Sequence, residues 1–235
     1  MPKLMKQQNI SWKTFDDGGA LRQAAFDAVM QCAANAIAER GRFLIVLAGG
    51  NTPRDVYAML REAPTDWSKW HVYYGDERCL AADHADRNSR MAEDSWLRHV
   101  AIPAQQVHAI PAELGPDLAA QAYHAVLADA GVFDLVLLGL GEDGHTASLF
   151  PGQAWDGGAG EAAIAVRNAP KPPPERVSIS ASRLSQARRV IFLATGAGKR
   201  EAIGQWRSGV ALPAAAIRPQ AGVEVYMDAA AEPGA

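Results

Sequence analysis

The sequence predicts one α/β domain built on a mostly parallel β-sheet with helices on both of its faces. Segments with helical periodicity alternate with short strand-like segments along the chain, as they do in β-α-β units. Several strand-like segments are apolar at every position, which is typical of strands covered on both sides. The 235 residues show no internal repeat and no clear linker, which favours a single domain over residues 1–235.

The first half of the chain shows this alternation clearly. Apolar residues recur at helical spacing over Leu21–Ile37, and Gly41 is placed to end that helix. The apolar run Phe43–Ala48 predicts a buried strand. Thr52 as N-cap and Pro53 as first helical residue predict the start of the next helix. The elements predicted to follow are a strand at Trp70–Tyr74, a helix at Asp86–His99, a strand at Val107–Ile110 and a helix at Asp117–Ala130.

The second half continues the pattern around a glycine-rich turn. The elements predicted there are strands at Asp134–Leu138, Arg176–Ser180, Val190–Ala194 and Val223–Met227, a helix at Gly198–Arg207, and loops at Gly157–Gly160 and Ala169–Pro174. Ligands of parallel sheets bind beyond the carboxyl ends of the strands. Four loops are therefore expected to meet at one edge of the sheet: Gly49–Pro53, Gly75–Asn88, Gly139–Phe150 and Thr195–Lys199.

Composition argues against several classes of protein. The net charge of −3 gives no basic excess for nucleic acid or an anionic membrane. Cys32 and Cys79 form no CxxC pair, and Cys32 lies on the apolar stripe of a predicted helix, so we expect reduced thiols and a cytoplasmic setting. The first residues lack the apolar core of a secretory leader, and no apolar run is long enough to span a membrane.

The segment Gly49-Gly50-Asn51-Thr52-Pro53 joins a predicted buried strand to a predicted helix. Two glycines allow the backbone to approach a ligand, and a helix start offers free N–H groups with a partial positive charge. These features suit a phosphate group. A tight turn with a good N-cap explains the same residues without any ligand, so both interpretations stay open.

The segment Gly139–Gly144 matches GxGxxG after a strand, but we do not expect it to bind a dinucleotide. Phe150-Pro151-Gly152 stops any following helix, and Asp143 stands where a pyrophosphate needs neutral backbone. The remaining interpretation is a turn that directs His145 toward the sheet edge. A lone histidine is often structural, but this position among glycines at a strand end favours a catalytic role.

Charged residues on the other loops invite two hypotheses. Asp76 and Arg78, separated by one residue after a strand, could face one cleft and stabilise an oxyanion, or they could be solvated. Arg176 and Lys199 could be surface charges or could converge on the Gly50–Thr52 loop to hold an anion.

Metal and serine chemistry are disfavoured. The acids Asp83, Asp86 and Asp143 lie near His84 or His145 without the spacing of a HExxH or CxxC site. Ser148 is not in a GxSxG motif. We expect neither a metal ion nor a cofactor.

Five segments occur together in one order: LAGGNTP, GDER followed by DHADRN, GLGEDGHTASLFPG, RVSIS and TGAGK. From Gly18 to Asp228 the chain resembles the 6-phosphogluconolactonase family, which belongs with the glucosamine-6-phosphate deaminases. The resemblance implies a Rossmann-like fold and metal-free hydrolysis of 6-phosphoglucono-δ-lactone to 6-phosphogluconate. It departs from the usual family pattern at Asn51, Ala81, Ala82 and Arg87.

The resemblance also implies a role for each matching residue. The phosphate is expected on Gly50, Asn51, Thr52, Arg176 and Lys199. His145 is expected to act as general base, and either Asp143 or Asp76 would orient it while Arg78 stabilises the oxyanion. His84 and Asn88 are expected to line the site.

Two rival functions separate on particular residues. A glucosamine-6-phosphate deaminase would typically carry a glutamate where Phe150 stands and a tyrosine where Arg78 stands. A non-catalytic sugar-phosphate sensor would normally carry a DNA-binding segment, and the sequence shows no basic helical extension. We expect a monomeric lactonase.

Overall fold

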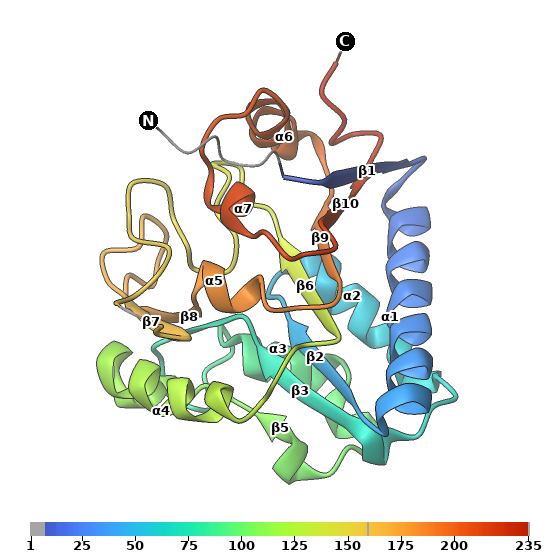
Figure 1. The fold of residues 1–235 in the computed structure, drawn as a ribbon, viewed down its shortest axis with the longest axis vertical. Coiled ribbons are helices and arrows are strands. Elements are labelled where there is room, and N and C mark those ends of the chain that lie inside the picture. The colour runs from blue at the N-terminus through green and yellow to red at the C-terminus, as the bar shows by residue number, and fades with distance from the viewer. Residues whose placement is uncertain (1–7, 159, 235) are drawn as a thin grey trace.

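A computed structural model describes residues 8–158 and 160–234, and its main feature is a parallel sheet (Figure 1). The first residues, where no secretory leader is expected, lie partly outside this range. The seven strands have the order β1-β10-β9-β6-β2-β3-β5, and all neighbouring pairs are parallel. Their bounds are β1 Ile10–Phe15, β2 Phe43–Leu47, β3 Trp70–Tyr74, β5 Val107–His108, β6 Leu135–Gly139, β9 Val190–Ala194 and β10 Val223–Asp228.

The helices confirm the predicted alternation, with several starts shifted by one or two residues. Their bounds are α1 Gly18–Arg40, α2 Asn51–Met59, α3 Asn88–Ser95, α4 Pro116–Ala128, α5 Ala181–Leu184, α6 Arg200–Arg207 and α7 Pro213–Ala216. Gly41 ends α1 in the left-handed region at φ 71°, as predicted. The N-cap prediction at Thr52 was wrong, because Gly50 is the N-cap of α2. Gly50 has φ 107°, which only glycine adopts easily, so the helix begins earlier.

A second, antiparallel sheet was not predicted. It has the order β4-β8-β7, with β4 Asp76–Arg78, β7 Ala163–Val166 and β8 Arg176–Ile179. The strand expected at Arg176–Ser180 therefore pairs here and not in the parallel sheet, and part of the loop expected at Gly75–Asn88 is a strand. These strands are very short and their partners are distant in sequence, so no local pattern announces them.

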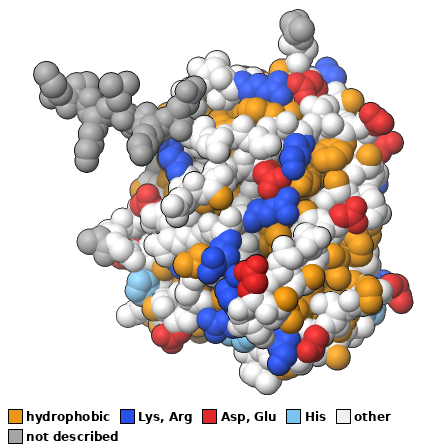
Figure 2. All heavy atoms as spheres, turned by 45° about the vertical axis from the view of Figure 1, so that its right-hand side comes forward, with side chains coloured by type: hydrophobic (Ala, Val, Ile, Leu, Met, Phe, Trp, Pro, Cys, Tyr) orange, Lys and Arg blue, Asp and Glu red, His pale blue; other side chains and the backbone are white. Residues whose placement is uncertain are grey.

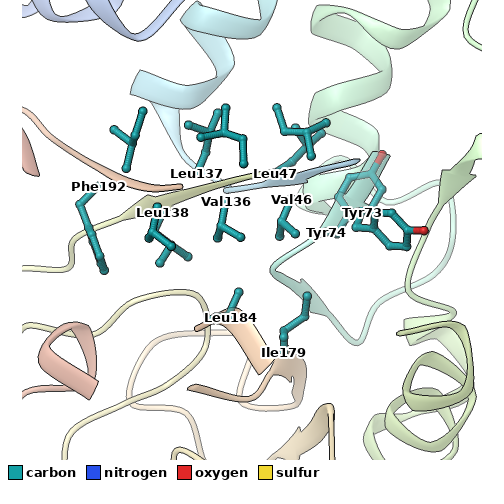
Figure 3. Close-up of a cluster of buried hydrophobic side chains, with 14 of the residues drawn as sticks. Val46, Leu47, Tyr73, Tyr74, Val136, Leu137, Leu138, Ile179, Leu184 and Phe192 are labelled. Carbon is teal, nitrogen blue, oxygen red and sulfur yellow. The ribbon is translucent and has the colours of Figure 1, made fainter. Parts of the chain in front are cut away.

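The apolar core fills both faces of the parallel sheet, as the uniformly apolar strands predicted. Side chains of β2 and β6 alternate between the two sides (Figure 3). Val46 and Val136 point toward Ile179 and Leu184, whereas Leu137 points to the opposite side. All five of these side chains are fully buried. The small sheet and α5 thus pack on one face of the parallel sheet. Helix α2 contacts both α1 and α3.

The strand order places a crevice in the middle of the sheet. From β2 the chain adds β3 and β5 on one side, and it then returns to β6, β9 and β10 on the other. The loops that follow β2 and β6 thus leave the sheet at a topological switch point, where doubly wound folds bind ligands.

The outer surface carries both signs of charge. Figure 2 shows Lys and Arg side chains beside Asp and Glu side chains across one face. None of the helices in residues 8–158 and 160–234 has the length and apolarity needed to cross a membrane.

Candidate active site

A cavity of about 370 Å³ opens at the carboxyl ends of the central strands, and all four predicted loops contribute to it. The polar and glycine residues that line it are Gly49, Gly50, Asn51, Thr52, Gly75, Asp76, Arg78, Asn88, Gly139, Gly141, His145, Lys171, Arg176, Thr195 and Lys199. A volume of this size suits a small-molecule ligand.

Two loops form one wall, and we call them the anchor loops: Gly49–Pro53 after β2 and Thr195–Lys199 after β9. A hydrogen bond of 2.7 Å between the Oγ1 atoms of Thr52 and Thr195 joins them. The N-terminus of α2 begins in the first loop, so its free N–H groups and partial positive charge face this region. The buried Asp228 carboxylate fixes the second loop by accepting the Gly196 N–H at 3.0 Å.

Lys199 supplies positive charge beside the anchor loops. Burial lowers the pKa of its ammonium, the Glu142 carboxylate opposes this by raising it, and the Lys171 charge lowers the pKa further. An anionic ligand would stabilise the charge of Lys199 that burial and Lys171 disfavour.

His145 lies in the glycine-rich turn after β6, as predicted. The Gly141 N–H donates to the His145 carbonyl oxygen at 2.8 Å, and the Thr146 hydroxyl donates to the Gly139 carbonyl oxygen at 2.9 Å. A side chain at Gly141 would overlap the imidazole ring, so this glycine is needed for the close approach. The turn therefore fixes the ring at the cavity.

The imidazole of His145 is paired with Asp143. Nδ1 of the ring and Oδ1 of Asp143 form a hydrogen bond, and the same carboxylate accepts the His145 backbone N–H at 3.2 Å. An ionised carboxylate only accepts, so Nδ1 carries the hydrogen and Nε2 is left as the basic nitrogen. Burial lowers the pKa of His145 from its ordinary value of 6.5, although the Asp143 bond and charge raise it. The ring is therefore neutral near pH 7.

Hydrogen-bond donors hold the carboxylate of Asp76. It is nearly buried, and its Oδ1 accepts from Nδ2 of Asn88 at 3.0 Å while its Oδ2 accepts from Oγ of Ser148 at 2.5 Å. Any side chain at Gly49 would overlap Asn88, so close packing requires a glycine as the first residue of the Gly49–Pro53 loop. Glu77, between Asp76 and Arg78 on β4, does not line the cavity, and it accepts the N–H groups of Asn88 and Ser89.

The two arginines at the cavity have different surroundings. Arg78 donates from Nη1 to the Asp86 carbonyl oxygen, and its buried Nε has no partner among the described residues. Arg176 donates to three successive carbonyl oxygens, those of Lys171, Pro172 and Pro173, at 3.0–3.1 Å. Arg176 therefore holds the segment that carries Lys171, whereas Arg78 lines the cavity without such bonds to that segment.

Comparison with known proteins identifies the family. The family model described as glucosamine-6-phosphate isomerases/6-phosphogluconolactonase matches residues 16–226. The chain belongs to this family. The resemblance inferred from its motifs is thus confirmed.

Named members of this family are similar over most of the chain. A 6-phosphogluconolactonase of Synechocystis sp. is 43% identical over 198 residues, which cover 79% of this chain and 81% of the relative. A 6-phosphogluconolactonase of Nostoc sp. is 36% identical over 92% of this chain and 94% of the relative. The crystal structure of 6-phosphogluconolactonase from Thermotoga maritima has a TM-score of 0.87 at 25% identity, covering 94% of this chain and 100% of that chain. The chain is an enzyme with the predicted Rossmann-like fold.

Most of the residues expected to form the family's site line the cavity, but some do not. His84 is exposed, and its Nδ1 accepts the Asp86 N–H at 3.1 Å, so the structure does not bring it to the cavity. Asp143 reaches the site only through His145. Within the described residues, no group of three or more His, Cys, Asp and Glu side chains could hold a metal ion.

Two site residues escaped the sequence analysis. Lys171 lies in a segment expected only as a loop, and the preceding sequence gives no helix or strand that would place it. Ser148 was considered only as a nucleophile. Its position in the turn of His145 was the available signal, because short turns bring close neighbours into one site.

Proposed function

We propose that this chain hydrolyses 6-phosphoglucono-δ-lactone to 6-phosphogluconate without a metal ion, with His145 as general base. The observation that carries this proposal is the His145–Asp143 pair at a cavity whose other wall is the N-terminus of α2 and Lys199. The names of the most similar relatives support the same substrate. Asp143, which contacts the imidazole, is the acid that we assign to orient it.

Each step of lactone hydrolysis has a matching group. Neutral His145 takes a proton through Nε2 from a water molecule as the water oxygen attacks the lactone carbonyl carbon. Arg78, which lines the cavity, stabilises the oxyanion that forms. The C–O bond to the ring oxygen then breaks, and His145 returns the proton to that oxygen. The carboxylate of Asp143 stabilises the imidazolium between these two transfers.

The anchor loops are proposed to hold the phosphate. Backbone N–H groups at the start of α2 can bond its oxygens, and Lys199 and Lys171 can neutralise its charge. Binding the remote phosphate fixes the reacting carbonyl near His145 and so lowers the entropic part of the barrier. Arg176 contributes by holding the Lys171 segment.

Deaminase chemistry is disfavoured by Phe150. Its ring is 1% exposed and lies 4.8 Å from the His145 ring, where the deaminase branch typically has a glutamate. A buried phenyl ring cannot donate or accept the proton that opening of an amino-sugar ring requires. A lactone needs no second acid for ring opening, because His145 itself returns a proton to the ring oxygen as the tetrahedral intermediate collapses.

A coupled assay tests the proposal. The purified chain is mixed with freshly made lactone, and 6-phosphogluconate release is followed with and without EDTA and corrected for spontaneous hydrolysis. We expect equal enzymatic rates in both conditions, and no ammonia release from glucosamine 6-phosphate. Loss of the rate in EDTA would contradict the metal-free mechanism, and ammonia release would favour the deaminase.

A further inference from the structure

Ser148 is a buried hydroxyl that the proposed mechanism does not use. Its side chain is 0% exposed, and its Oγ donates to Oδ2 of Asp76 at 2.5 Å. Since a carboxylate is an acceptor only, the single hydroxyl hydrogen of Ser148 is committed to Asp76. Arg176 approaches the same Oγ from Nη1 at 3.5 Å. Ser148 therefore acts as a donor to Asp76 and not as a nucleophile.

The bond to Ser148 also joins the two parts of the site. Ser148 belongs to the turn of His145, whereas Asp76 begins β4 of the small sheet. The backbone N–H of Ser148 donates to Oγ of Ser178 on β8 at 3.2 Å. Two serine contacts thus tie the turn to the small sheet, but only the one made by the Ser148 side chain touches Asp76.

The carboxylate of Asp76 is fixed from both sides and still has acceptor capacity. Asn88 donates to Oδ1 and Ser148 donates to Oδ2, yet each oxygen has a second lone pair. Asp76 lines the cavity, so a ligand can reach it. A rigid acceptor at the cavity selects a ligand group that donates a hydrogen bond, such as a hydroxyl. A ligand group without a donor would displace water from the carboxylate and leave that acceptor unsatisfied.

The place of Asp76 indicates which hydroxyl it meets. Asp76 and His145 line the same cavity, and Asp76 is bonded to Ser148 in the turn that carries His145. The carbon atom attacked under His145 catalysis is the carbonyl carbon, so the nearest hydroxyl of a sugar lactone is the one on the adjacent carbon, C2.

We propose that Asp76 accepts the C2 hydroxyl of the substrate and that Ser148 is the positioning residue that fixes Asp76 for this contact. The inference rests on the lactonase function proposed above. Ser148 thereby determines selectivity for 2-hydroxy lactones, and its loss affects discrimination more than it affects the proton transfers at His145.

The test compares two substrates, 6-phosphoglucono-δ-lactone and its 2-deoxy analogue. For each variant, kcat/KM on each lactone is divided by the spontaneous hydrolysis rate of that lactone, and the ratio of the two results gives the selectivity. We expect the wild-type chain to prefer the 2-hydroxy lactone by about 100-fold, as for a charge-assisted hydrogen bond. Ser148→Ala should reduce this preference about tenfold, mainly by raising KM for the 2-hydroxy lactone.

Ser178→Ala is the matched control. It removes another buried serine hydroxyl that holds the same turn. Ser178 pairs with Asp76 through the backbone of β4 and β8, but its hydroxyl bonds the Ser148 N–H and the Ile179 carbonyl oxygen and not the Asp76 carboxylate. Its rate can fall, yet its selectivity should equal that of the wild type. Ser148→Cys keeps the volume with a weaker donor and should give an intermediate selectivity. If thermal unfolding shows that Ser148→Ala does not fold, Ser148→Cys replaces it in the comparison with Ser178→Ala.

The outcomes separate the inference from the proposed function. Wild-type activity on 6-phosphoglucono-δ-lactone with equal efficiency on the deoxy analogue would overturn the inference and leave the function standing. The inference is also overturned if Ser148→Ala and Ser178→Ala change selectivity equally, or if Ser148→Cys matches Ser148→Ala. A wild-type chain inactive on both lactones would overturn both claims.

Discussion

The two walls of the cavity are built in different ways. The wall of the anchor loops consists largely of backbone, with a helix start and two glycine-containing turns joined by the Thr52–Thr195 bond. The wall around His145 consists of side chains, and it depends on contacts with the small antiparallel sheet. Under the proposed function, the wall of the anchor loops binds the remote anion and the wall around His145 performs the chemistry.

The largest expected effect tests the wall around His145. His145→Asn removes the base but keeps a polar side chain of similar reach, so we expect kcat to fall by about 10²- to 10⁴-fold. Binding of 6-phosphogluconate, measured by calorimetry, should change little because the anchor loops are intact. His99→Asn, an exposed histidine at the end of the α3 region, is the control and should keep the wild-type rate. Wild-type turnover in His145→Asn would contradict the assignment of His145 as general base.

A smaller effect tests the wall of the anchor loops. Lys199→Met removes one positive charge near the α2 N-terminus, and we expect KM to rise by about 10- to 100-fold with kcat nearly unchanged. Lys69→Met is the matched control, because exposed Lys69 precedes β3 at the amino end of the sheet. A fall in kcat with constant KM in Lys199→Met would show that the two walls do not divide binding from chemistry.

The smallest effect concerns pH. Burial lowers the pKa of His145 below 6.5, so the neutral base persists to lower pH, and kcat/KM should fall only when pH drops below that value. Asp143 raises the same pKa, so Asp143→Asn should move this acid limb to still lower pH while reducing the maximal rate. An acid limb above pH 6.5 in the wild type would require another titrating group.

The sequence predicted the wall of the anchor loops better than the wall around His145. The anchor loops follow from local signals, since a buried strand, glycines and a helix start are contiguous at Gly49–Pro53. The choice between Asp143 and Asp76 as the partner of His145 depends on how one turn folds, which spacing does not determine. The small sheet pairs Asp76 with Ser178 across distant sequence, so its support of Asp76 was beyond local patterns.

The same limit applies to single residues. Arg176 was correctly expected at the cavity, but its bonds to three carbonyl oxygens depend on the path of a segment without periodicity. His84 shares a loop with Arg78, yet a turn of the backbone leaves it in solvent. Loop conformation, rather than strand or helix pattern, decided both positions.

The pairing of β1 with β10 has a consequence for synthesis of the chain. Ile10 lies opposite Val223 and Phe15 opposite Asp228, so the first strand gains its partner only when the last strand has been made. Until then the segment of β1 has nothing to pair with, and the growing sheet keeps an open edge beside β9. Contacts this distant form slowly, because a long loop must close first. Completion of the sheet is therefore a late event in the folding of this enzyme.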